Sequence, residues 1–204
     1  MSKSNLAVKE ELENVAVENV IIINQNEQEN YRPSKDKEIR VNNNLSYLIM
    51  KKIVDIIAGI LGTILLVPLI AVVWFIRICL HENDGPLFFE QIRIGKNGKQ
   101  FRMYKFRTMV MEADEKLYRY LEENPEAKKE YKKYKKLKHD PRITKLGNIL
   151  RKTSLDEFPQ FVNILKGEMS LVGPRPYLYR EKEDLGGYYY NSITKVKPGI
   201  TGYW

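Results

Sequence analysis

An uncharged apolar segment constrains this chain more than any other feature. It covers residues 56–76, which are 21 positions without a charged side chain between Asp55 and Arg77. As a helix with a rise of about 1.5 Å per residue it would be roughly 31 Å long, close to the hydrocarbon thickness of a bilayer. Some fifty mostly polar residues precede it, which is unlike a cleavable signal peptide. We therefore predict a membrane helix over residues 47–80.

The way this helix enters the membrane depends on Pro68. Basic side chains flank the segment on both sides, so the positive-inside rule gives no direction. Proline removes a backbone N–H and clashes with the preceding turn. We predict a helix broken at Pro68 whose arms return to the same side of the membrane. The alternative is a kinked helix that spans the bilayer.

The parts on either side of this helix differ in charge and composition. Residues 1–46 are rich in Asn, Glu, Gln and Lys, and we predict that they form a disordered tail. Residues 81–204 hold 25 basic and 17 acidic side chains, and so carry the formal net charge of +8 of the whole chain. A basic domain attracts phosphate groups of nucleic acids, lipids or nucleotides, and charge alone does not choose among them.

The local pattern of residues 81–204 predicts an α+β fold. Residues 87–109 are rich in β-prone side chains around a GKNGK turn, which predicts a hairpin with Gly95 and Gly98 at positive φ. Residues 112–140 have a helical composition with an interruption at Asn124-Pro125. Seven lysines and two tyrosines in residues 128–138 favour a solvated helix face, with anionic lipid and single-stranded nucleic acid as alternative partners.

A short helix is predicted to begin near Asp156 and to have an apolar face of Phe158, Phe161, Ile164 and Leu165. Ser154 and Glu157 have the spacing of a capping box, Pro159 suits a first turn if Asp156 is the cap instead, and Gly167 can end the helix in the left-handed conformation. Acidic residues at such a helix start have two interpretations. They stabilise the first turn, or they meet a phosphate and a divalent cation there.

Several motifs follow the apolar segment in order: YKFRTM at 104–109, DPRIT at 140–144, LRKTSLDEFPQFVNILKGEMSLVGPRP at 150–176 and KPGITGYW at 197–204. Together they resemble the bacterial sugar transferase family, the monotopic phosphoglycosyl transferases, over residues 47–204. The resemblance implies a re-entrant membrane helix followed by a small, mostly helical catalytic domain with a minor β-hairpin, over residues 81–204.

The same resemblance implies an enzyme on the cytoplasmic face of the bacterial plasma membrane. Members of the family transfer a sugar 1-phosphate from a UDP-sugar to undecaprenyl phosphate with Mg²⁺, which begins the synthesis of exopolysaccharide, capsule, O-antigen or other glycans. The implied partners are a UDP-hexose, undecaprenyl phosphate and membrane lipids, with a homodimer as a further partner. No nucleic-acid partner is expected, because no recognition motif accompanies the lysine run.

By the family's motifs, Asp156 is the nucleophile that forms a covalent phosphosugar intermediate, and Glu157 helps to bind the metal. The resemblance also places Lys105, Arg107, Arg151 and Arg175 on basic positions that contact substrate phosphates. In SLVGPRP, the two prolines around Arg175 stiffen the loop that presents its guanidinium.

The sequence departs from the family pattern at two places. Many members have Ser before the breaking proline, where this chain has Val67. Members also continue with a Gln-Val-x-Gly-Arg loop and further residues beyond Trp204, so we expect the C-terminal part of the domain to be missing. The alternative to an active transferase is an inactive truncated remnant or a membrane-bound interaction partner of a polysaccharide assembly complex.

Overall fold

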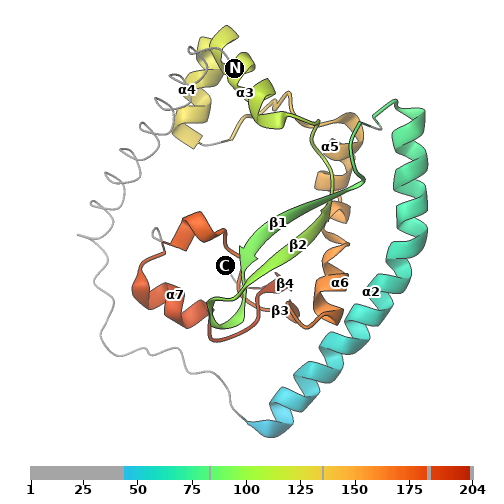
Figure 1. Cartoon of the computed structure of the whole chain (residues 1–204), viewed down its shortest axis with the longest axis vertical. Helices are drawn as coiled ribbons and strands as arrows, with labels where there is room; N and C mark the ends of the chain where they lie inside the picture. Colours follow the sequence, from blue (N-terminus) through green and yellow to red (C-terminus); the bar gives the residue numbers. More distant parts are fainter. Residues whose placement is uncertain (1–43, 83, 135, 183–184, 203–204) are drawn as a thin grey trace.

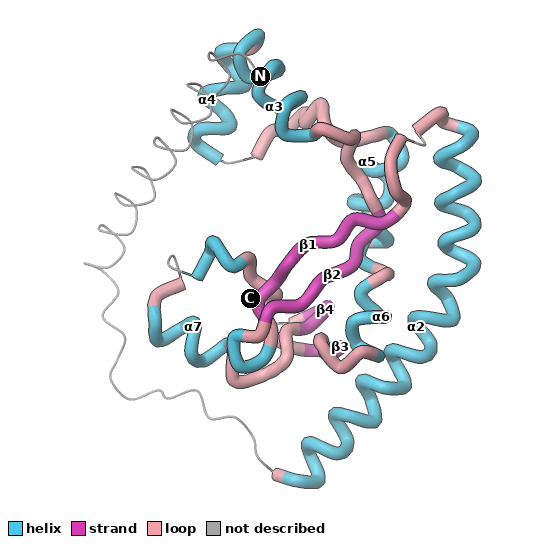
Figure 2. Tube along the Cα trace, in the orientation of Figure 1, coloured by secondary structure: helices cyan, strands magenta, loops and turns pink. Residues whose placement is uncertain are grey.

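The computed structural model describes residues 44–82, 84–134, 136–182 and 185–202. Almost all of the predicted N-terminal tail, residues 1–43, lies outside the described residues. The described part has the predicted α+β composition, with two small sheets among helices (Figure 2). Its elements are α2 (Leu45–Cys79), β1 (Phe88–Ile94), η1 (Lys96–Gly98), β2 (Gln100–Phe106), α3 (Ala113–Glu123), α4 (Pro125–Tyr134), α5 (Lys145–Lys152), η2 (Leu155–Glu157), α6 (Gln160–Leu165), β3 (Ser170–Val172), η3 (Tyr179–Lys182), α7 (Gly187–Ile193) and β4 (Gly199–Thr201), where η denotes a 3₁₀ turn.

Helix α2 packs on the domain through one face and leaves the other face exposed. The buried face consists of residues at helical spacing: Gly59, Gly62, Leu66, Val73 and Arg77. Most large apolar side chains of the helix are exposed, including Trp74 and Phe75. Within the described residues, α2 is the one helix that is long and apolar enough to cross a membrane, by length and composition.

α2 is assigned as one helix through Pro68, and the predicted break at this residue stays a prediction about how the helix lies in a membrane. Leu66 precedes Pro68 and Val73 follows it, and both pack in one core cluster with Phe106 and Leu150 of the domain. The helix therefore packs on the domain on both sides of the proline, which cannot donate the usual backbone hydrogen bond, and α2 changes direction along its length (Figure 1).

The short helix α6 lies between α2 and the β1–β2 hairpin, while α7 lies on the other side of the hairpin (Figure 1). Two glycines allow α2 and α6 to approach closely. A side chain on Gly62 would overlap the ring of Phe161, and one on Gly59 would overlap Leu165. Three residues of the predicted apolar face therefore lie against these glycines of α2: Phe161, Ile164 and Leu165.

The hairpin forms as predicted, with a different turn. β1 and β2 pair antiparallel, from Phe88 opposite Phe106 to Ile94 opposite Gln100. Gly98 has the predicted positive φ of 73°, but Gly95 is extended and Asn97 takes the second left-handed position with φ of 57°. The reason is that the reversal centres on residues 96–98, where the Lys99 N–H donates to the Lys96 carbonyl.

The helical interruption at Asn124-Pro125 is confirmed by the boundary between α3 and α4. A second sheet was not predicted: β3 pairs in parallel with β4, with Ser170 opposite Gly199 and Val172 opposite Thr201. These strands are only three residues long and give little sequence signal. Their pairing places the GPRP loop, residues 173–176, beside the start of β4.

Candidate active site

The two acidic residues of the predicted site lie in the 3₁₀ turn η2 and not in a regular helix. Ser154 is in the left-handed region with φ of 56° and makes no side-chain cap, so the predicted capping box is wrong. The regular helix α6 begins after Pro159, later than predicted. The turn is closed instead by backbone bonds, such as the Glu157 N–H donating to the Ser154 carbonyl. Gly167 ends the helix with φ of 74°, as predicted.

Glu157 forms the closest contact between predicted site residues. The Lys105 ammonium on β2 donates to Glu157 Oε1 at 2.6 Å. The side chains are 24% and 38% exposed, respectively, so the pair is open to solvent on one side. A cation and a carboxylate therefore meet where a phosphorylated substrate can reach both.

Asp156 lies beside this pair in a half-buried position. Burial raises the pKa of its carboxyl; Lys105 opposes the increase, Glu157 adds to it, and Arg151 opposes it. Three of the predicted site residues thus act electrostatically on Asp156. Partial desolvation makes a carboxylate more nucleophilic, and the neighbouring cations favour its ionised form.

Arg151 is positioned by the packing of α5 against the loop after β2. A side chain on Gly147 would overlap the backbone of Thr108, so this glycine lets the two segments touch. The Arg151 Nε then donates to Thr108 Oγ1 at 2.8 Å. The end of α5 therefore places a guanidinium next to η2.

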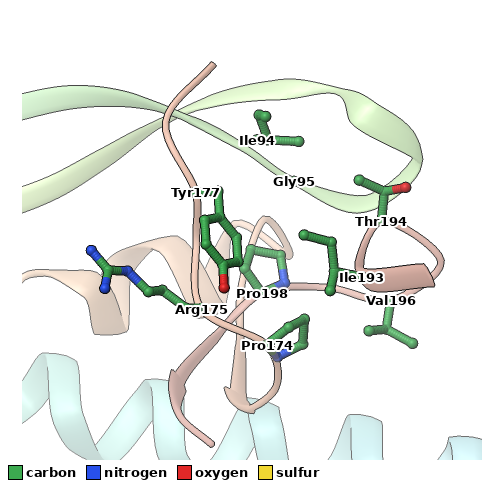
Figure 3. Close-up of a pocket in the computed structure, with 9 residues that line it drawn as sticks. All are labelled: Ile94, Gly95, Pro174, Arg175, Tyr177, Ile193, Thr194, Val196 and Pro198. Carbon is green, nitrogen blue, oxygen red and sulfur yellow. The ribbon is translucent and has the colours of Figure 1, made fainter. Parts of the chain in front are cut away.

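The other two predicted arginines have different contacts. Arg107 Nε donates to the Pro86 carbonyl at 3.0 Å, and its guanidinium lies over the Phe89 ring at 5.7 Å. Arg175 lies with its guanidinium 5.9 Å from the centre of the Tyr177 ring. Its side chain extends away from a small pocket that the GPRP loop forms with residues 193–198 (Figure 3). The structure thus groups Lys105, Arg151 and the two acids, and it pairs neither Arg107 nor Arg175 with them directly.

Asn163 belongs to none of the predicted site residues, and it is fully buried with 0% exposure. Its Nδ2 donates to the Arg102 carbonyl and to Glu168 Oε2, each at 2.7 Å, and its Oδ1 accepts from the Tyr104 N–H at 3.1 Å. These bonds fix β2 against α6 just before Lys105. A lone amide within the apolar run FVNIL was the signal in the sequence, because a buried amide requires partners.

The described residues contain no group of three or more His, Cys, Asp or Glu side chains that could hold a metal ion. Asp156 and Glu157 offer two neighbouring carboxylates. This donor set fits Mg²⁺, which is often held by one or two carboxylates together with substrate phosphates and water, and not by a complete protein cage.

The structure thus joins an apolar helix of membrane length to a small domain that gathers carboxylates and cations at one turn. The chain belongs to the bacterial sugar transferase family, whose pattern its sequence matches over residues 46–204.

Three relatives illustrate the similarity. The undecaprenyl-phosphate galactose phosphotransferase of Salmonella typhimurium is 44% identical over 81% of this chain and 35% of its own length. The exopolysaccharide production protein ExoY of Sinorhizobium fredii is 41% identical over 76% of this chain and 68% of its own length. The UDP-glucose:undecaprenyl-phosphate glucose-1-phosphate transferase of Klebsiella pneumoniae is 39% identical over 76% of this chain and 30% of its own length.

The chain thus spans about a third of the length of the Salmonella relative. The resemblance found in the sequence is confirmed at the level of the family. The alternative, an inactive truncated remnant or a membrane-bound interaction partner, is not favoured, because these relatives are named for phosphate transfer or exopolysaccharide production.

Proposed function

We propose that this protein transfers a hexose 1-phosphate from a UDP-sugar to undecaprenyl phosphate and so begins the assembly of an exopolysaccharide or related glycan. The observation that carries the proposal is the Lys105–Glu157 pair at 2.6 Å beside the half-buried Asp156. The names of the relatives support the donor and acceptor classes, since they include galactose and glucose phosphate transferases that act on undecaprenyl phosphate.

In the proposed reaction, a carboxylate oxygen of Asp156 attacks the sugar-bearing β-phosphorus of the donor. The bond from this phosphorus to the bridging oxygen breaks, and UMP leaves with that oxygen. A phosphate oxygen of undecaprenyl phosphate then attacks the aspartyl phosphosugar, which breaks the phosphorus–Asp156 bond and regenerates the carboxylate. Dividing one transfer into two displacements predicts ping-pong kinetics.

The neighbouring residues have electrostatic roles in this scheme. Lys105 and Arg151 supply positive charge for the donor phosphates, and their charge also opposes the raised pKa of Asp156. Asp156 and Glu157 are the residues that would hold Mg²⁺. Lys105 would then contact both Glu157 and a donor phosphate. When bound, Mg²⁺ neutralises diphosphate charge and stabilises the departing UMP. Arg107 and Arg175 are proposed to contact the acceptor or donor phosphates from the edges of the site.

We also propose that both ends of α2 lie on the cytoplasmic side of the membrane. Near its start, Lys51 Nζ donates to Ser170 Oγ, and Asp55 Oδ1 accepts from the Leu171 N–H at 2.9 Å. Near its end, Val73 packs in the domain core. The domain therefore runs along most of the helix, and a perpendicular crossing would carry its polar surface into the hydrocarbon. This arrangement favours a re-entrant helix that inserts through its outer face.

Cysteine labelling tests this topology. Cys79 is free and exposed at the end of α2, and Asn44→Cys in a Cys79→Ser background marks the start. In intact spheroplasts, a maleimide that cannot cross membranes is expected to label neither position, and lysis should expose both. Labelling of one position alone before lysis would mean that α2 spans the membrane.

Measurement of UMP release tests the proposed reaction. The 204-residue chain, in lipid discs with Mg²⁺, undecaprenyl phosphate and a panel of UDP-sugars, is expected to release UMP with one preferred sugar. Without acceptor lipid, a single burst of UMP and a protein mass increased by the phosphosugar are expected. Asp156→Asn should abolish the burst and the mass increase.

Asp114→Asn is the matched control, because Asp114 is an exposed acid on α3. It should leave both signals unchanged. Normal turnover by Asp156→Asn would contradict the covalent scheme. Absence of UMP release with every sugar in the wild-type chain would contradict the proposed function of these 204 residues.

A further inference from the structure

Arg93 lies on β1 outside the residues that the sequence motifs assign to the site. Its Nη1 donates to the Pro176 carbonyl at 3.1 Å, and its Nη2 donates to Gln91 Oε1 at 2.6 Å. The side chain is only 12% exposed. Arg93 therefore binds the last residue of the GPRP loop through a largely buried side chain.

The same end of β1 makes a second contact with this loop. The Ile94 N–H donates to the Tyr177 carbonyl at 2.9 Å. Two consecutive residues of β1 thus bind two consecutive carbonyls that directly follow Arg175. The direction in which the loop presents Arg175 depends on these contacts, since the other end of the loop is fixed by β3.

The charge of Arg93 is incompletely balanced. Its nearest acid among the described residues, Glu181, lies 3.9 Å from Nη1, and its buried Nε has no hydrogen-bond partner in this part of the chain. Burial lowers the pKa of the guanidinium; Glu181 opposes this change, Arg175 and Arg180 add to it, and Glu157 opposes it. Arg93 thus lies within electrostatic range of both Arg175 and Glu157 of the proposed site.

We propose that Arg93 is a positioning residue for sugar-phosphate transfer: it holds the Pro176 carbonyl so that Arg175 faces the donor phosphates beside Glu157. This inference rests on the proposed function. A purely structural role fits poorly, because a buried charge with an unpaired donor costs stability, and an apolar side chain of similar volume would fill the same space without that cost.

The test compares Arg93→Met with Arg102→Met. Arg102 is on the neighbouring strand and 74% exposed, and its guanidinium pairs with Glu90 alone among the described residues, at 3.4 Å, so it is a matched control. Arg93→Met is expected to raise KM for the UDP-sugar about 10-fold to 100-fold, with a smaller change in kcat, because the loop loses its register while the dyad stays intact. Arg102→Met should leave both constants unchanged.

A double-mutant cycle separates positioning from general damage. If Arg93 acts through Arg175, Arg93→Met should add less than about twofold to the KM of an Arg175→Met enzyme. Arg93→Lys, which keeps the charge but not the two-point contact, should restore little of the loss. Full additivity with Arg175→Met, or an unchanged KM, would overturn the proposal.

Hydrogen exchange of residues 171–178 gives a measure that does not depend on turnover. Arg93→Met is expected to accelerate exchange in this segment and not in β2, whereas Arg102→Met should change neither. Unchanged exchange would overturn the role of Arg93 even if the enzyme is active. If Arg93→Met accelerates exchange but the wild-type chain turns over no UDP-sugar, the proposed function is wrong, and the positioning role is wrong with it.

Discussion

The two sides of residues 155–165 differ in their polar contacts. Toward α2 the segment presents Phe161, which packs against Gly62, and Leu165, which packs against Gly59. Toward β2 it presents Glu157 in an ion pair and Asn163 in two hydrogen bonds. One short stretch of chain therefore attaches the domain to its apolar helix and also carries the candidate reactive groups.

The difference between these sides concerns stability. On the apolar side, close packing stabilises the fold and needs no charge. On the polar side, a half-buried Asp156 with a raised pKa destabilises the fold at neutral pH. We expect substitutions on the first side to change stability more than chemistry, and those at the dyad to do the reverse.

The largest expected effect is that of Lys105→Met on catalysis. Loss of the ammonium leaves Glu157 without its partner and removes the charge that opposes the raised pKa of Asp156. We expect kcat/KM for the UDP-sugar to fall by about 10²-fold to 10³-fold, the range for loss of one electrostatic contact in a transition state. The pH below which activity declines should also move upward, because Asp156 must be ionised to attack.

The control for this change is Lys99→Met, since Lys99 is exposed just before β2. Its pH profile and kcat/KM should match those of the wild type. An unchanged pH profile in Lys105→Met would show that Lys105 does not influence the ionisation of Asp156.

The sequence predicted Lys105 and Glu157 as site residues from motifs 52 positions apart, but the direct pairing of their side chains came only from the structure. Alternation and turn residues were sufficient to predict the hairpin, because both signals are local. The capping box is also a local signal, but here it is wrong. Ser154 and Glu157 have the correct spacing, whereas Pro159 and the contact with β2 favour a 3₁₀ turn.

The next prediction concerns Asn163, which joins the two sides. Asn163→Ala leaves the Tyr104 N–H and the Arg102 carbonyl without their buried partner. We expect a loss of about 3 kcal/mol in the free energy of unfolding, from unpaired polar groups and the cavity. Activity should also decrease at temperatures where the variant is folded, because β2 no longer holds Lys105 in place.

Denaturant titration in detergent measures this change, and Asn148→Ala, an exposed position on α5, is the control. A loss of stability with fully normal kcat/KM would mean that Asn163 supports the fold alone.

A smaller effect is expected on the apolar side. Gly62→Val places a branched side chain against the Phe161 ring, which must move. We expect a loss of about 1–3 kcal/mol in the free energy of unfolding, as for overpacked cores, with less than threefold change in KM. Ala71→Val, on the exposed face of α2, should change stability by less than about 0.5 kcal/mol.

A large increase in KM in Gly62→Val would contradict this expectation, because it would mean that α2 packing controls the reactive side. Sequence reasoning identified an apolar face in residues 156–167, but not its contact with Gly59 and Gly62. Glycines within an apolar helix have no local signature that distinguishes a contact face from any other face, so only the packed structure identifies their partners.

The smallest expected effect is a gain in stability and not a loss. Because burial raises the pKa of Asp156 in the folded protein, the folded state binds a proton more tightly there than the unfolded state does. Stability from this group is present at low pH and is lost as pH rises from the unfolded pKa through the raised folded pKa. Asp156→Asn removes the charge, so we expect a higher Tm than the wild type at pH 7, and a difference in Tm that shrinks as pH falls through the raised folded pKa toward the ordinary pKa of Asp. Scanning calorimetry of both proteins between pH 4 and pH 8 in one detergent measures the difference, with Asp114→Asn as control. A lower Tm at pH 7 would mean that Lys105 and Arg151 more than offset the burial of Asp156, and that the polar side of the segment stabilises the fold as the apolar side does.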